Sequence, residues 1–112
     1  MWGSVELANE ANLRSLASRC GSPAFSRRFV ADSESFVAQT SAPGQAEANA
    51  RAIQGASPLA GTRSAQFSSS DCATYTESLR QIESDRKDIL SSASKRDAYV
   101  RKAVEERAVS GR

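Results

Sequence analysis

The sequence predicts an all-α fold, a small bundle of three to four helices with a long C-terminal helix at about residues 72–108. Apolar residues recur at the spacing of amphipathic helices over several stretches. Residues that typically start or stop helices lie at the edges of these stretches. The chain has 112 residues, of which 39% are hydrophobic and 6% aromatic, so it fits one domain with a mostly aliphatic core.

The first helix is expected at about residues 5–20, after a short leader. Ser4 offers an oxygen that can cap a helix start, and Gly21 is a typical stop. Residues 1–4 read Met-Trp-Gly-Ser, in which Gly-Ser is a common product of cloning, so we expect a single helical domain over 5–112. The start of the chain lacks the basic and apolar segments of a secretory signal, although a trimmed chain would have lost one.

The second helix is expected at about residues 23–40. Ser22 followed by Pro23 combines a helix cap with a proline at the first helical position, where its missing N–H costs nothing. Three phenylalanines then fall almost on one line of this helix: Phe25, Phe29 and Phe36. Aromatic rings at helical spacing are typical of a core rather than of a ligand site.

A short third helix at about residues 45–54 is expected to end at Gly55. Its alternation of Ala with polar residues superficially suggests a strand, but Ala is the best helix former and is depleted in strands. Residues 55–71 are rich in Gly, Ser and Pro and predict a flexible loop, attached to the core at Leu59 and Phe67.

The apolar pattern that follows Asp71 is the strongest in the chain. Ten residues share one arc of about 100° when the helical angle runs on without a reset: Cys72, Tyr75, Leu79, Ile82, Ile89, Leu90, Ala93, Val100, Val104 and Ala108. This shared phase, and the absence of Gly and Pro between Cys72 and Ser110, favour one continuous helix through the serines at 91–94. The alternative is a kink near 91–94, with the last third folded back as a further helix.

A continuous helix of this length would be about 55 Å long, whereas a compact domain of this size is roughly 34 Å across. Its second half would then expose an apolar stripe, narrow and interrupted by Arg86 and Asp97. Such a surface needs a partner. The candidate partner-binding residues are Ile89, Leu90, Ala93, Val100 and Val104.

The composition excludes several classes of function. The chain contains no histidine, which removes imidazole catalysis and almost every zinc site, and no nucleotide-binding or calcium-binding motif occurs. We therefore predict a non-enzymatic protein with no catalytic, cofactor-binding or metal-binding residues and no cofactor. A net charge of +2 does not support a nucleic-acid partner, and no run approaches the roughly 18 apolar residues of a membrane span.

The two cysteines, Cys20 and Cys72, are candidates for a disulfide. Both fall on apolar faces, one at the end of the first helix and the other at the start of the long one. A disulfide suits a thin core exported to an oxidising compartment. The alternative is two reduced cysteines that behave as small buried hydrophobes. The chain is expected to be extracytoplasmic in the first case and cytoplasmic in the second.

Two functions remain open. The first is a protein–protein interaction or oligomerisation module that acts through its long amphipathic C-terminal helix. This helix would form a coiled coil with a protein partner or with a second copy in a homodimer. The second is an exported, periplasmic or secreted, disulfide-bonded helical adaptor, inhibitor or effector. This second protein would bind its target through residues 55–71 or through the outer face of the 23–40 helix.

Overall fold

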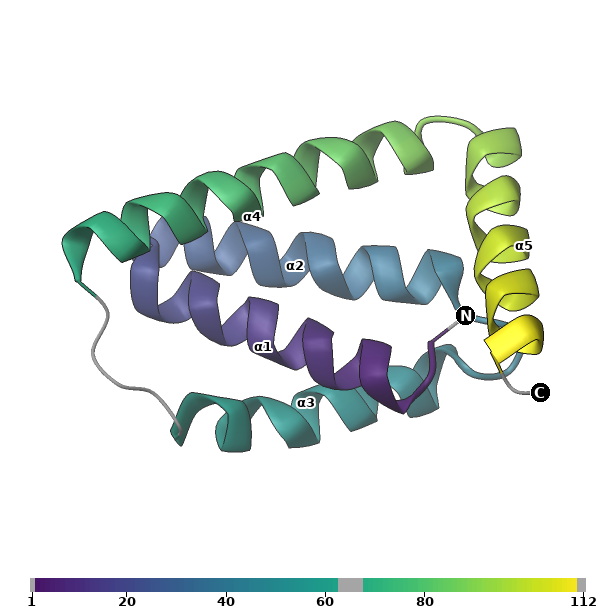
Figure 1. Ribbon diagram of the computed structural model, residues 1–112, viewed down its shortest axis with the longest axis horizontal. Helices are drawn as coiled ribbons and strands as arrows, with labels where there is room; N and C mark the ends of the chain where they lie inside the picture. Colours follow the sequence, from purple (N-terminus) through teal and green to yellow (C-terminus); the bar gives the residue numbers. More distant parts are fainter. Residues whose placement is uncertain (1, 63–67, 111–112) are drawn as a thin grey trace.

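The computed structural model describes the backbone of residues 2–62 and 68–110, and the side chains of these residues except those of 57–62 and 102–110. The described residues form a small bundle of α-helices without strands, so the all-α prediction is confirmed (Figure 1). The predicted count of three to four helices was too low, because there are five: α1 (Ser4–Cys20), α2 (Pro23–Thr40), α3 (Ala46–Thr62), α4 (Ser69–Leu90) and α5 (Ala93–Ser110).

Helix α1 lies at the centre of the bundle, where it contacts α2, α3 and α4. Helix α2 also contacts α3, α4 and α5. Helix α4 runs along one side of the bundle, and α5 turns across the end at which the N-terminus lies (Figure 1). The chain therefore folds around α1 and α2, and α5 closes one end.

The caps explain where the first two helices begin. Helix α2 has the predicted bounds, and the Oγ of Ser22 accepts a hydrogen bond of 3.1 Å from the backbone N–H of Phe25. Helix α1 begins at Ser4 itself, so the predicted cap was one residue late. Its N-cap is Gly3, whose backbone N–H donates to Oε1 of Glu6 at 2.9 Å.

Among the described side chains the apolar core includes two clusters, and the three phenylalanines of α2 are buried as predicted. One cluster joins α1, α2 and α4, with these buried members: Ala17, Phe25, Phe29 and Leu79. The other joins α1, α2 and α3, with these buried members: Ala11, Val37 and Ile53. The indole of Trp2 packs edge-on against Phe36 at 6.1 Å and donates to Oγ1 of Thr40 at 2.9 Å. Trp2 is thus part of the folded body, while the cloning origin of residues 1–4 stays a prediction.

Helix α3 is longer than predicted, because it continues through Gly55 to Thr62. Ile53 and Ala56 pack against the core on both sides of Gly55, and this packing outweighs the cost of roughly 1 kcal/mol for a glycine inside a helix. The predicted end of the helix at Gly55 was therefore wrong, and so was a loop beginning at residue 55. Residues 63–67, the rest of the predicted loop before the cap of α4, lie outside the described residues.

The prediction of one continuous helix at 72–108 was wrong, and the alternative of a kink near 91–94 was right. Helix α4 ends at Leu90, and α5 begins at Ala93. The Oγ of Ser91 donates to the backbone oxygen of Asp88 at 2.6 Å, and the Oγ of Ser92 accepts from the N–H of Lys95 at 3.1 Å. These serines end one helix and cap the next, since their side chains compete with helical backbone bonds. The molecule is 38 Å in its longest dimension, so no 55 Å rod leaves it.

Candidate functional site

The predicted partner-binding residues do not form one stripe in the structure. Ile89 and Leu90 end α4 and are half-buried, Val100 lies half-buried on α5, and Ala93 is exposed at the start of α5. The side chain of Val104 lies outside the described residues. The bend between the helices separates these residues, so their common helical phase does not produce a common face.

Cys20 and Cys72 lie at disulfide-bonding distance, as predicted. Their Cα atoms are 4.8 Å apart, and the bond closes a sequence separation of 52 residues. Both side chains are half-buried. The bond ties the last residue of α1 to the first turn of α4, at the end of the bundle opposite α5 (Figure 1). Both cysteines of the chain are used in it.

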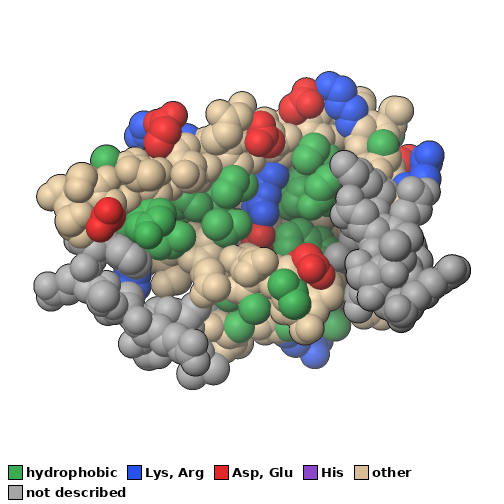
Figure 2. All heavy atoms as spheres, in the orientation of Figure 1, with side chains coloured by type: hydrophobic (Ala, Val, Ile, Leu, Met, Phe, Trp, Pro, Cys, Tyr) green, Lys and Arg blue, Asp and Glu red, His purple; other side chains and the backbone are tan. Residues whose placement is uncertain are grey.

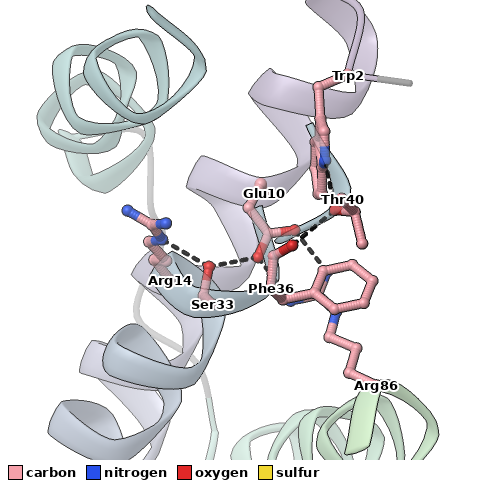
Figure 3. Close-up of polar contacts among 7 residues, drawn as sticks. All are labelled: Trp2, Glu10, Arg14, Ser33, Phe36, Thr40 and Arg86. Atoms are coloured by element: carbon pink, nitrogen blue, oxygen red, sulfur yellow. Dashed lines mark hydrogen bonds and ion pairs between the residues drawn. The ribbon is translucent and has the colours of Figure 1, made fainter. Parts of the chain in front are cut away.

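A buried polar network at the meeting point of α1, α2 and α4 is the most distinctive feature of the molecule (Figure 3). Glu10 on α1 is only 2% exposed, and Ser33 on α2 is 1% exposed. The Oγ of Ser33 donates to Oε2 of Glu10 at 2.5 Å and accepts from Nε of Arg14 at 2.8 Å. One buried serine hydroxyl therefore connects an acid and a base that lie one turn apart on α1.

Arg86 of α4 completes this network from the other side. Its two terminal nitrogens donate to the two carboxylate oxygens of Glu10 at 2.6 and 2.7 Å, a bidentate pair. The guanidinium also lies over the ring of Phe36, 4.4 Å from the ring centre. The carboxylate of Glu10 thus receives three hydrogen bonds, and the paired guanidinium compensates for the cost of burying its charge.

A second ion pair holds α4 to α2. Arg28 donates to both carboxylate oxygens of Glu83 at 3.1 and 3.3 Å, and Glu83 is 8% exposed. The hydrogen bond that Arg28 donates to Glu83 raises the pKa of Arg28 above its ordinary value. Burial lowers the pKa of Arg14, and the negative charge of Glu10 opposes that effect. The guanidinium groups of Arg14 and Arg28 both stay charged at physiological pH.

A recess that described residues line beside this network is too small for an organic ligand. It lies between α2 and α4 and has a volume of about 80 Å³, room for two or three water molecules, against the 300 Å³ or more of typical ligand sites. Phe29, Ser33, Arg86 and Leu90 are among its lining residues. Figure 2 shows hydrophobic side chains gathered between α4 and the helices below it, with basic and acidic side chains among them.

The described residues contain no group of three or more acidic or cysteine side chains placed to hold a metal ion. Within the same residues, every buried side-chain nitrogen and oxygen has a hydrogen-bond partner. The polar groups of the network therefore bond to one another, and their role is to hold the helices together.

This network was not predicted, although the sequence contains one signal of it. Arg86 interrupts the apolar stripe of the C-terminal region, and a base on a buried face requires an acid opposite it. The acid, Glu10, lies 76 residues away along the chain, and the serine between them has no distinguishing pattern. Only the packing of α1 against α4 identifies the pair.

Comparison with known proteins identified no relative: no family model, no curated protein and no solved structure matches this chain. None of the described helices has the length and hydropathy needed to cross a membrane.

Proposed function

We propose that this protein is an exported, non-catalytic helical binding protein, in which a disulfide-closed bundle presents a fixed surface to a protein partner. The observation that carries the proposal is the pairing of Cys20 with Cys72. Disulfides persist in oxidising compartments and are rare where glutathione and thioredoxin keep thiols reduced. They are also typical of small domains whose core is too thin to be stable alone.

The polar network adds a second reason to expect a rigid binding surface. Glu10 and Arg86 fix the position of α4 on α1, while the disulfide fixes one end of the same helix. A surface that is already ordered loses less conformational entropy when a partner binds. We therefore expect the partner to bind a preformed face, and the outer face of α2 is our candidate.

That outer face is exposed along the whole helix, at these positions of regular helical spacing: Ala24, Arg27, Ala31, Glu34 and Ala38. Small side chains allow close approach of another helix. One basic and one acidic residue give the face a positive and a negative end. The other expected function was assembly through a straight C-terminal helix that extends beyond the body of the domain. That reasoning no longer applies, because α5 is a separate helix that lies across the bundle.

The experiment begins with the redox state of the protein isolated from its natural source. Protein unfolded without a reductant is treated with a thiol reagent, and we expect no reactive thiols. Two reactive thiols per chain would contradict export to an oxidising compartment and with it the proposal.

The binding surface is then tested by cross-linking and mass spectrometry in an extract of the same compartment. We expect one partner to cross-link to the oxidised protein. The Ala31→Arg variant places a large charged side chain on the outer face of α2, and we expect it to lose this cross-link. The control is Thr74→Arg on exposed α4, which should keep the partner. Equal capture by both variants would show that α2 is not the binding face.

A further inference from the structure

The connection between α4 and α5 is short and built from residues that also suit a helix. It consists of Ser91 and Ser92. Ser91 has φ −67° and ψ −19°, which are helical values, so the direction of the chain changes after it. No Gly or Pro occurs from Cys72 to Ser110, and serine costs only about half a kcal/mol relative to alanine in a helix. A straight helix from α4 into α5 is therefore accessible to this sequence.

Within the part of the chain that the structure describes, α5 is held in its bent position by contacts with α2 and α4. Lys95 of α5 pairs with Asp88 of α4 across the hinge at 2.7 Å. The ring of Tyr99 packs edge-on against Phe36 at 5.4 Å, and Arg96 donates to Oε1 of Gln39 at 3.1 Å. Both contacts are made with α2, which does not move if the hinge opens. The place that α5 occupies is therefore a ready-made site for an identical helix.

The apolar positions on both sides of the hinge agree with an open form. Ile82 and Val100 lie 18 residues apart, which is five full turns, and Ile89 falls within about 20° of the same line. In the bent chain these residues share a helical phase but do not form a common face. In a straightened chain it produces one apolar line along a single helix, where a second chain can pack.

We propose that the Ser91–Ser92 hinge opens and exchanges α5 between two copies of this chain, which gives a domain-swapped homodimer with a continuous α4–α5 helix. The partner's α5 then takes the position beside Phe36 that the chain's own α5 has in the monomer. All contacts between α5 and α2 are kept, so monomer and dimer differ mainly in the hinge and in the entropy of association. This inference goes beyond the proposed function and does not depend on it.

The hinge sets the balance between the two forms. In the bent chain the Oγ of Ser92 accepts from the N–H of Lys95 at 3.1 Å and caps α5. In the straight chain this cap is not needed, because the backbone N–H groups at the start of α5 find helical acceptors. Loss of the cap oxygen therefore weakens the bent form alone.

The first test is Ser92→Ala, measured by sedimentation equilibrium over a range of protein concentrations. A helix cap of this kind contributes about fivefold to an equilibrium constant. Two hinges open in each dimer, so we expect the dissociation constant of the dimer to fall about 25-fold. The matched control is Ser94→Ala on the exposed side of α5, which should shift it less than threefold.

The variant Ser92→Gly tests the opposite direction. Glycine serves almost as well as serine at a cap but disfavours a continuous helix. We expect this variant to be more monomeric than the wild type. A wild type and a Ser92→Ala variant that both remain monomeric at several hundred micromolar would overturn the proposal, and so would equal effects of the alanine and glycine changes.

Cross-linking separates a swapped dimer from an ordinary one. Gln39→Cys and Arg96→Cys together place one thiol on α2 and one on α5, and a short bismaleimide joins them; Cys20 and Cys72 do not react while bonded. In the isolated dimer of a Ser92→Ala chain with these two cysteines, we expect covalently linked dimers on a denaturing gel. Links confined to single chains would refute the exchange. The single variant Arg96→Cys is the control for contacts between the two α5 helices.

Discussion

Replacing Arg86 by methionine is the sharpest test of the buried network. Methionine keeps most of the length and apolar contact of the arginine stem over Phe36 but removes the charge and both hydrogen bonds to Glu10. Glu10 is 2% exposed in the wild type, and the variant leaves its carboxylate with Ser33 as the remaining donor. Removing one partner of a buried ion pair typically costs about 3–5 kcal/mol, since the other charge stays buried without compensation.

The expected change in melting temperature follows from the length of the chain. An unfolding entropy of about 2.1 cal/mol/K per residue gives roughly 235 cal/mol/K for 112 residues, so each kcal/mol shifts the melting temperature by about 4 °C. The Arg86→Met protein should therefore melt about 13–21 °C below the wild type. Thermal unfolding followed by circular dichroism, with the disulfide intact, measures this shift.

The control is the same substitution at an exposed ion pair. Arg51 pairs with Glu47 one turn away on α3, and the Arg51 side chain is 73% exposed. Arg51→Met should lower the free energy of unfolding by less than about 1 kcal/mol. If Arg86→Met and Arg51→Met had equal effects, the network would not contribute to stability in the way that we infer.

A double variant measures the pair itself. Glu10→Gln alone leaves Arg86 without its anion, but Arg86 is 17% exposed and keeps its place over the Phe36 ring, so we expect a loss of about 2 kcal/mol. The combination with Arg86→Met should cost less than the sum of the two single changes, with a coupling of about 1–3 kcal/mol. Strict additivity would mean that the two side chains do not interact.

Further predictions concern other parts of the fold. Replacing Cys20 and Cys72 by serine should lower the free energy of unfolding by up to about 4 kcal/mol in chemical denaturation, and reduction of the wild type should raise hydrogen exchange in α4 before α1–α3. Gly21→Ala should cost about 1–3 kcal/mol, because the added Cβ would lie 2.5 Å from a phenylalanine ring, whereas Gly55→Ala, with nothing within 4 Å, should stabilise by about 0.5–1 kcal/mol. Trp2→Ala should cost about 2–3 kcal/mol in the same assay if the indole is packed as described, and no loss would contradict its place in the core.

The parts of the fold that the sequence predicts are those with local signals. The bounds of α2 follow from Ser22, Pro23 and a regular line of phenylalanines, and all of these act within a few residues of one another. The pairing of Cys20 with Cys72 could also be predicted, because a chain with two cysteines on apolar faces offers a single intramolecular choice. In each case the signal needs no knowledge of which helices become neighbours.

The errors have the opposite cause. The apolar residues of 72–108 keep one helical phase, so the region looked like one helix. The bend allows Tyr99 to pack on Phe36, and these residues lie 63 positions apart, so no local pattern contains the contact. Gly55 looked like a helix stop, but the packing of Ile53 and Ala56 carries α3 through it. The network of Glu10 and Arg86 was missed for the same reason. Tertiary contacts override weak local preferences wherever the difference is about 1 kcal/mol.

The attachment of α4 explains why this fold needs both a disulfide and a buried network. Only Leu79 and Glu83 of α4 are buried, and one of these is a charged residue. Apolar burial of so few side chains contributes little that is specific to one position of the helix. Bidentate pairing of Arg86 with Glu10 accepts a single geometry, and the covalent bond at Cys72 fixes the first turn. Helix α4 is therefore positioned by directional contacts more than by its apolar surface, whereas α5 has its own contacts with α2 at Phe36 and Gln39.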